Sequence, residues 1–382
     1  MSAPRLFLWS WPALQRNKTR AAQSDPEIQP AIDKLLSDVE AALALEPVTV
    51  MSKALVPPSG DKHDYMSMGP YWWPNPDTAD GLPYIRKDGE VNPEGESLDR
   101  RKLGRMMSAV ASLALGWHLF DDKRAAEHGA RLLRTWFTDP ETKMNPHLEF
   151  GQSIPGICDG RGIGIIDTAG YTSLIEAIGL LDHSGAITDM DRSDLLMWMK
   201  AYRDWLVTSD TGRDEAHTKN NHGTWYDAQL CALSLYTGDP RIVHKVTEEV
   251  KEYRIEVQIA PDGSQPHELA RTKSMSYTAM NTSALMNLAR YAEHVEVDLW
   301  NYESPDGRGL RKAVDFLVPY VVDGERWTWQ QIADFDKAGF VSQFQRAAVA
   351  YQDRRYLDAI EFLPERAAAD RVHLCFDRFG ED

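Results

Sequence analysis

Two short segments of this chain carry the side chains best suited to acid–base chemistry. The first spans residues 219–223 and reads Lys-Asn-Asn-His-Gly; the second spans 268–271, Glu-Leu-Ala-Arg, and is followed by Tyr277. Together they offer an amide, an imidazole, a guanidinium and a phenol. This set suits the removal of a proton from beside a carboxylate and the delivery of a proton to a leaving oxygen.

A uronic acid polymer linked through O4 presents that chemistry. The proton at C5 is weakly acidic because it lies next to the carboxyl group, and its removal allows the bond to O4 to break by β-elimination. The reaction needs a group that neutralises the carboxylate, a base for C5–H and an acid for O4.

The four side chains can fill these roles. The Asn221 amide can donate to the carboxylate, and Arg271 can bind carboxylate oxygens as a fork. His222 can accept a proton or hydrogen-bond the acid group. Tyr277 can take the proton and pass it on if its pKa, ordinarily about 10, is lowered by Arg271 and His222.

Other catalytic chemistries find less support. A histidine at a helix start is commonly a cap or a surface residue. His267-Glu268 lacks the second histidine of a zinc-protease helix, and His217 and His222 are poorly spaced for one helical face. No Gly-x-Ser-x-Gly sequence occurs, although a Ser-His-Asp triad stays open. We expect neither a catalytic metal nor a cofactor.

The overall charge limits the partners. The 382 residues are 43% hydrophobic and 26% charged, with a net charge of −16, which argues against general nucleic-acid binding. No apolar run approaches twenty residues, so we expect no membrane span. An anionic ligand would need a local basic cleft, and the candidate cations are Arg100, Arg101, Arg161, Lys219, Arg271 and Lys273.

The cysteines and the N-terminus leave the compartment open. Cys158, Cys231 and Cys375 allow one disulfide at most and do not have zinc-site spacing. Residues 1–12 carry one arginine and a short apolar patch, which is no convincing signal peptide. A secreted or periplasmic protein given in mature form would look the same, and we expect that location, with the cytoplasm as the alternative.

The elements that must position these residues are helices. Apolar residues recur at three- and four-residue steps, and strand alternation is scarce. The predicted helices are 28–45, 103–119 (capped by Ser97 or Asp99), 123–137, 167–181, 193–207, 225–236, 241–255, 274–293, 309–321 and 341–351. Apolar helices alternate with more charged ones, which predicts one all-α domain, 1–382, built as an incomplete (α/α) toroid of helical hairpins. An open solenoid or an ordinary bundle is the alternative.

Two long irregular segments, 48–97 and 139–166, exceed the usual length of a structureless loop and are therefore functional candidates. The first contains Tyr71-Trp72-Trp73 between prolines, a flat surface on which sugar rings can stack. It is predicted to lie over the cleft, unless Trp72 and Trp73 simply plug one end of the toroid. The second contains a glycine-rich run, 160–164, but no predicted strand precedes it, which argues against dinucleotide binding.

These motifs resemble a known family. Residues 220–223, 268–272 with Tyr277, 59–65 continuing to 71–74, and 160–168 are together similar to the alginate-lyase-like polysaccharide lyases. The closest resemblance is to polysaccharide lyase family 38, with family 5 more distant, and it covers roughly residues 45 to 350. It implies an incomplete (α/α) toroid and metal-independent β-elimination of an anionic polysaccharide.

The resemblance also implies roles by position. Asn221 and Arg271 would handle the carboxylate, His222 would assist or act as base, and Tyr277 would be the acid. The candidate substrate-binding residues are Lys62, His63, Tyr71, Trp72, Trp73, Gln152, Arg161, Lys219, Glu268 and Lys273.

Stereochemistry narrows the roles further. Mannuronate and glucuronate place H5 and O4 on the same side, so one group, Tyr277, can serve as base and acid while His222 tunes it. For guluronate, His222 would be the base and Tyr277 the acid. The expected activity is a lyase on poly-mannuronate or glucuronan. The alternatives are a glycoside hydrolase using two of Asp64, Asp159, Asp167 and Glu268, or a non-catalytic carbohydrate-binding protein using Trp72 and Trp73.

Overall fold

Four long helices form the inside of the molecule. They are α3 (Asp99–Phe120), α5 (Tyr171–Ser184), α8 (Asn221–Thr237) and α12 (Ser274–Glu293), and each packs against the next in chain order. Most of their side chains are buried because apolar residues surround each helix on nearly all sides. The computed structural model describes residues 3–380; the remaining residues of the predicted 1–382 domain, 1–2 and 381–382, lie outside that range.

Four further helices pack on the outside of this inner set. They are α2 (Gln29–Leu43), α4 (Lys123–Leu133), α6 (Asp189–Thr208) and α9 (Pro240–Val250). Each keeps one face in water, as its amphipathic sequence predicts. Inner and outer helices therefore alternate along the chain as hairpins.

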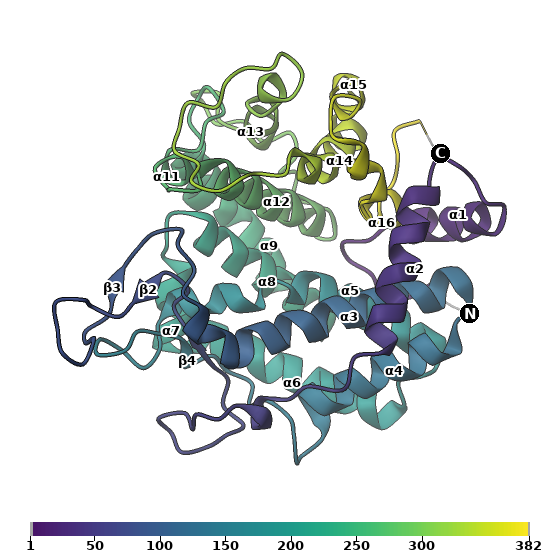
Figure 1. Ribbon diagram of the computed structural model, residues 1–382. Helices are drawn as coiled ribbons and strands as arrows, with labels where there is room; N and C mark the ends of the chain where they lie inside the picture. The colour runs from purple at the N-terminus through teal and green to yellow at the C-terminus, as the bar shows by residue number, and fades with distance from the viewer. Residues whose placement is uncertain (1–2, 381–382) are drawn as a thin grey trace.

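The ring closes through the two ends of the chain. The contacts run from α12 to α14 (Val341–Tyr351), on to α16 (Val372–Cys375), and from α16 to both α1 (Trp11–Ala22) and α2. Figure 1 shows the first and last helices side by side. The predicted all-α toroid built from helical hairpins is confirmed.

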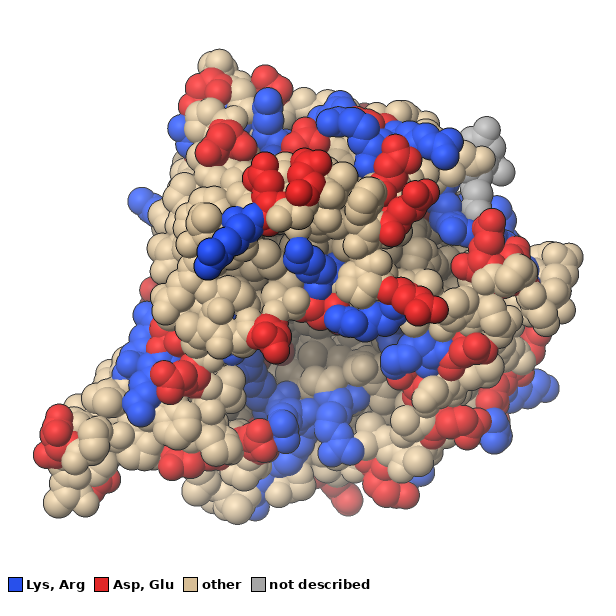
Figure 2. All heavy atoms as spheres, turned by 45° about the horizontal axis from the view of Figure 1, so that its top comes forward, with Lys and Arg blue, Asp and Glu red and all other residues tan. Residues whose placement is uncertain are grey.

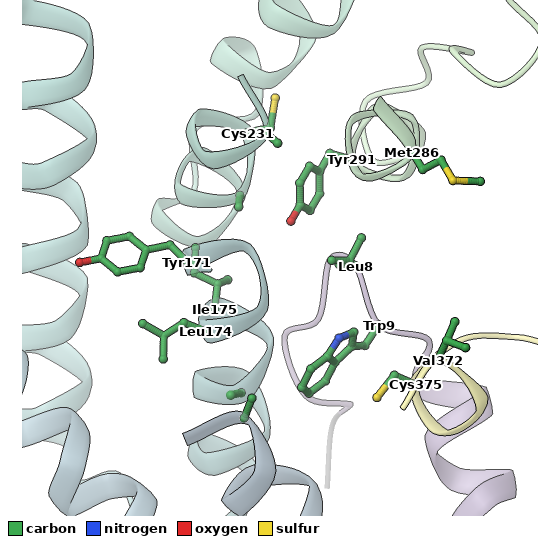
Figure 3. Close-up of a cluster of buried hydrophobic side chains, with 14 of the residues drawn as sticks. Leu8, Trp9, Tyr171, Leu174, Ile175, Cys231, Met286, Tyr291, Val372 and Cys375 are labelled. Carbon is green, nitrogen blue, oxygen red and sulfur yellow. The ribbon is translucent and has the colours of Figure 1, made fainter. Parts of the chain in front are cut away.

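A buried cluster seals this closure. Leu8 and Trp9 of the N-terminal segment lie among side chains of α5, α8, α12 and α16, as Figure 3 shows. The carboxylate of Glu176 on α5 accepts the backbone N–H groups of Phe7 and Trp9 at 3.0 Å. Burial raises the pKa of Glu176 to about 7, and these N–H bonds oppose the rise.

Most of the predicted helices occur, two of them with the predicted bounds, α12 and α14. The expected caps of α3 are wrong: its N-cap is Leu98, and the Asp99 carboxylate accepts from Lys53 instead. The predicted helix 309–321 is also too long, because α13 ends at Asp315 and a separate 3₁₀ turn contains Pro319. The remaining helical elements are η1 (Val50–Ser52), η2 (Pro93–Ser97), η3 (Arg134–Thr138), η4 (Gly162–Thr168), α7 (Asp210–Ala216), η5 (Lys251–Ile255), α10 (Glu256–Gln258), α11 (Pro266–Leu269), α13 (Leu310–Asp315), η6 (Val318–Tyr320), η7 (Lys337–Phe340), α15 (Arg355–Ile360) and η8 (Glu365–Ala369).

Short strands organise the two long irregular segments. Strand β1 (Met66–Met68) pairs in parallel with β4 (Phe150–Ser153), which ties the first segment to the second. Strand β2 (Trp72–Trp73) pairs antiparallel with β3 (Ile85–Arg86). This β2–β3 hairpin projects at the left of Figure 1.

One long apolar stretch and two of the three cysteines are buried in this fold. The stretch Gly162–Ser184 is long and apolar enough to cross a membrane, but 67% of its most apolar window is buried inside the fold, as in a core helix. The three cysteines are free thiols, two of them buried.

A buried ion pair fixes the first irregular segment to α3. Lys53 Nζ lies 3.0 Å from Asp99 Oδ2, and both side chains are fully buried. The same ammonium donates to the carbonyl oxygens of Val50 and Lys62 at 2.7 Å each, so its three N–H groups all have acceptors. The Asp99 carboxylate also accepts the Met66 N–H just before the aromatic hairpin.

We expect Lys53→Met to destabilise the protein by about 3–5 kcal/mol, because it leaves a buried carboxylate without its cation. Urea unfolding followed by tryptophan fluorescence measures the change. Lys102→Met is the matched control, since Lys102 lies 3.5 Å from the same carboxylate but is partly exposed. The double variant Lys53→Met/Asp99→Leu should recover most of the loss. A single variant as stable as the parent protein would contradict the assignment.

Candidate active site

Tyr277 lies in the first turn of α12, and two side chains hold its hydroxyl. Arg271 Nη2 donates to the Tyr277 oxygen at 2.9 Å, and the Tyr71 hydroxyl lies 2.6 Å from it. The Arg271 guanidinium also sits over the Tyr277 ring, 3.9 Å from its centre. The hairpin segment and the start of α12 therefore meet at this phenol.

The protonation of Tyr277 differs from the expectation. Burial and the hydrogen bond with Tyr71 raise the pKa of Tyr277 above its ordinary value, and the nearby Arg271 charge offsets only part of the rise. In the free protein Tyr277 therefore keeps its proton at neutral pH, whereas the sequence-based expectation was a lowered pKa.

Asp88 holds Arg271 in place. Arg271 Nε and Nη2 bind the two Asp88 oxygens at 3.1 and 2.8 Å, a bidentate pair. Asp88 also accepts from the backbone N–H and hydroxyl of Thr272, and from Arg86. Burial alone would raise the pKa of Asp88, but the Arg271, Arg86 and Thr272 hydrogen bonds lower it far below its usual range.

A buried carboxylate likewise orients His222. Glu215, on α7, is fully buried and lies 2.8 Å from His222 Nδ1 through one oxygen; its other oxygen has no partner within the described residues. Burial raises the pKa of Glu215, and the His222 charge opposes the rise. With Nδ1–H donated to Glu215, a neutral His222 keeps Nε2 as an acceptor.

Asn221 begins α8 and is bound by Glu268. Its backbone N–H and its side-chain Nδ2 donate to the two Glu268 oxygens at 2.6 and 2.7 Å. Burial raises the pKa of Glu268, and these two bonds oppose the rise. The Asn221 amide thus has one N–H committed to Glu268 and a second available for another acceptor.

Arg161 lies next to the pair formed by Glu215 and His222. Arg161 donates to the backbone and side-chain oxygens of Gln152 at 3.0 and 3.1 Å, and its guanidinium lies 5.8 Å from the centre of a Trp72 ring. The Arg161 charge acts on Glu215, so this arginine is close to the carboxylate that holds His222.

These contacts join the candidate residues into one ring of neighbours. The charges of Arg271 and His222 both lower the pKa of Glu268. Glu268, which binds Asn221, is therefore close to both His222 and the Arg271–Tyr277 pair. Tyr71 and Trp72, adjacent in sequence, reach Tyr277 on one side and Arg161 on the other. In Figure 2, Lys and Arg side chains gather around a hollow in the middle of the face shown, although the whole chain is acidic.

The other predicted substrate-binding residues fall into two groups. Lys273 Nζ lies 5.9 Å from the Tyr71 ring and so belongs with the set. Trp73 instead donates to the Glu90 carbonyl. The Lys62 carbonyl accepts from the Lys53 ammonium, and His63 Nδ1 contacts the Lys143 carbonyl. Lys219 is exposed and lines a separate groove.

The remaining sequence candidates have structural partners, except Asp159, which is exposed and forms no hydrogen bond or ion pair within residues 3–380. Asp167 binds Tyr65, Ser67, Gln152 and Arg100, and Arg101 pairs with Glu96 at the surface. Asp64 pairs with His147. A short strand, β4, does precede the glycine run 160–164, contrary to expectation, but the run leads into a 3₁₀ helix, and within residues 3–380 no later strand pairs with β4. Over residues 3–380, no three His, Cys, Asp or Glu side chains are grouped as metal ligands.

Sequence reasoning missed Glu215 and Asp88. Glu215 and His222 lie on different helices, so no helical spacing links them. Asp88 and Arg271 are separated by 183 positions. The local sequence around Asp88, Lys-Asp-Gly, signals a turn and nothing more.

Comparison with known proteins gives a consistent result. A family model described as "Alginate lyase" matches residues 49–327. An alginate lyase of solved structure from Bacteroides ovatus is 40% identical, with a TM-score of 0.94 over 98% of this chain and all of that chain. Alginate lyase A1-III from Sphingomonas species A1 is 15% identical, with a TM-score of 0.58 over 95% of this chain and 94% of its own. A variant of A1-III complexed with a tetrasaccharide is also 15% identical, with a TM-score of 0.59 over 88% of this chain and 90% of its own. The comparison with curated proteins gives no match.

Proposed function

This chain belongs to the alginate lyase family and is a polysaccharide lyase, and we propose that it cleaves 1,4-linked poly-mannuronate or glucuronan by metal-independent β-elimination. One observation carries the proposal: the Tyr277 hydroxyl lies between Arg271 and Tyr71, in the same ring of neighbours as Asn221 and His222. Each of the three roles that elimination requires then has a candidate group.

The substrate carboxylate is bound by Arg271 and by the free N–H of Asn221. Asp88 and Glu268 fix these two groups before substrate arrives, so no reorganisation is needed as charge develops on the carboxylate. The protein's own cations and amides supply the neutralisation that a metal ion would otherwise give.

Tyr277 acts twice. His222 Nε2, left free by the bond from Nδ1 to Glu215, first receives the phenol proton, and Arg271 stabilises the resulting phenolate. The phenolate then takes the proton from C5, the C5–H electrons form the C4–C5 double bond, and the C4–O4 bond breaks. The same phenol finally protonates O4, which is possible because H5 and O4 lie on one side in mannuronate and glucuronate.

An absorbance screen tests the substrate and the reaction. Purified poly-mannuronate, glucuronan and poly-guluronate are incubated with the enzyme, with and without a chelator. We expect ultraviolet absorbance from the new C4–C5 double bond to rise fastest on the first two polymers and to be unaffected by chelation. Cleavage without such absorbance would contradict the elimination mechanism. Loss of activity on chelation would contradict metal independence.

The pH dependence of His222→Ala tests the first proton transfer. We expect kcat to fall on the order of 10²- to 10⁴-fold at neutral pH. The residual activity should then rise about tenfold per pH unit on the alkaline side, because solvent hydroxide must remove a proton from Tyr277, whose pKa is raised. The variant is compared with Glu215→Gln, which keeps the imidazole. A flat pH profile for His222→Ala would show that Tyr277 is not the base.

A further inference from the structure

A cavity of about 790 Å³ lies away from the Tyr277 site and is not used by the mechanism. We call it the outer groove. Its walls come from the end of α6, from α7, α8 and α9, and from the turn formed by η5 and α10, with Val207, Tyr253 and Val257 among its lining residues.

The outer groove exposes apolar and aromatic surface to water. Tyr253 is 59% exposed, and Val207 and Val257 are 39% and 38% exposed. Buried apolar side chains of α8 and α9, among them Leu230 and Val246, form the floor below them. An exposed ring beside a shallow apolar floor is a surface on which the C–H face of a sugar can stack.

The charge of the outer groove is opposite to that of the whole chain. Four Lys or Arg side chains and two carboxylates line it, whereas the chain as a whole has 42 basic and 58 acidic residues. Arg254 and Asp227 pair at 2.7 Å in the floor. At the rim, Lys245 lies 3.8 Å from Glu249, and within residues 3–380 Lys219 has no ion-pair partner. Among the described residues Arg213 pairs with the fully exposed Asp210 and donates to the Thr208 carbonyl, which leaves its charge largely available.

The outer groove shares a wall with the Tyr277 site. Arg254 donates to the carbonyl oxygens of Ala216 and Thr218 at 2.7 and 3.1 Å, so it holds the segment that leads from Glu215 to Asn221 and His222. Lys219, on the groove side of this segment, is two residues from Asn221. The segment from Ala216 to His222 therefore lies between the outer groove and the Tyr277 site.

We infer that the outer groove is a second polyuronate-binding site, in which Tyr253 stacks on a sugar ring and the rim cations bind uronate carboxylates. The inference rests on the proposed function, because it takes the substrate of the catalytic site as its ligand. Occupation of both sites by one polymer raises the effective concentration of the chain at the catalytic cleft, so the groove should matter for long substrates and not for short ones.

The double variant Tyr253→Ala/Lys245→Ala tests this inference. We expect KM for poly-mannuronate to rise on the order of tenfold, with kcat and the kinetics on a tetramannuronate unchanged, because a ligand held in the catalytic cleft alone gains nothing from the groove. The matched control is Lys123→Ala/Phe362→Ala, which removes another exposed lysine and a ring that is also 59% exposed. The control should leave both substrates unaffected.

The other outcomes separate this inference from the proposed function. Unchanged KM on the polymer in the groove variant, with normal cleavage by the parent protein, overturns the groove and leaves the lyase intact. An equal rise on polymer and tetramer shows an effect on the His222 segment and also overturns it. Groove-dependent binding of a neutral polysaccharide, measured by affinity electrophoresis, overturns the assignment to a uronate. If the parent protein cleaves no polyuronate, the proposed function itself falls.

Discussion

Tyr277→Phe is expected to lower kcat on poly-mannuronate by at least about a thousandfold, because one hydroxyl supplies both the base and the acid and each role contributes on the order of 10²- to 10⁴-fold. The phenyl ring keeps its place under the Arg271 guanidinium, so KM should change little. Initial rates of absorbance increase on purified polymer measure both constants.

Tyr71→Phe is the control for this prediction. It removes one of the two partners of the Tyr277 hydroxyl but leaves the hydroxyl itself. Because the Tyr71 bond is one of the causes that raise the pKa of Tyr277, its loss should lower that pKa. The expected result is a modest change in kcat and an alkaline limb of the pH profile displaced to lower pH. If Tyr277→Phe kept kcat within tenfold of the parent value, the phenol would not be the proton carrier.

The second large effect is expected at Arg271. Arg271→Ala removes the cation that faces the substrate carboxylate and the donor that stabilises the Tyr277 phenolate. Loss of one preorganised donor typically costs 10²- to 10³-fold, and we expect a fall of about 10³-fold in kcat/KM on poly-mannuronate. Arg271→Lys should recover little of it, because a lysine cannot reproduce two parallel N–H bonds.

Asp88→Asn tests how much of the effect depends on Asp88 holding Arg271 in place, as distinct from the contacts that Arg271 itself makes. The guanidinium stays, but its carboxylate partner becomes a neutral amide, so we expect about a tenfold fall in kcat/KM and a smaller change in thermal stability than a lost buried ion pair would give. An Asp88→Asn variant as inactive as Arg271→Ala would show that the pair is mainly structural. Arg271→Ala with nearly normal kcat/KM would remove Arg271 from the mechanism.

The sequence predicted the fold through local periodicity. Helices α12 and α14 were predicted with their observed bounds because their apolar pattern is long and uninterrupted. The cap of α3 could not be predicted, since the Asp99 carboxylate is taken by Lys53, a residue far outside that helix. Helices α1 and α7 were missed because α7 has only 7 residues and α1 buries only Ala13, Leu14 and Asn17, so neither carries a clear apolar periodicity.

The site was predictable as a set of residue types but not as an arrangement. Asn221, His222, Arg271 and Tyr277 stand in one ring of neighbours. The carboxylates that hold them were invisible, because pairs such as Asp88–Arg271 arise only when distant segments meet. Lys219 is a further example: the sequence shows its charge but not that its side chain lines the outer groove.

The closure of the ring has a consequence for biosynthesis. The Ser10 N–H donates to the Cys375 carbonyl at 2.8 Å, and Asn17 Nδ2 donates to the carbonyl oxygens of His373 and Leu374 at 3.0 Å each. These bonds join residues more than 350 positions apart. During synthesis, the N-terminal segment around Trp9 is made long before residues 372–377, the segment that it binds.

Folding of this toroid therefore cannot finish repeat by repeat as translation proceeds, unlike that of an open solenoid. The inner helices can assemble early, but the apolar side chains at the closure stay uncovered until residues 372–377 have been made. A chain that stops before residue 372 would therefore keep an exposed apolar edge at the closure.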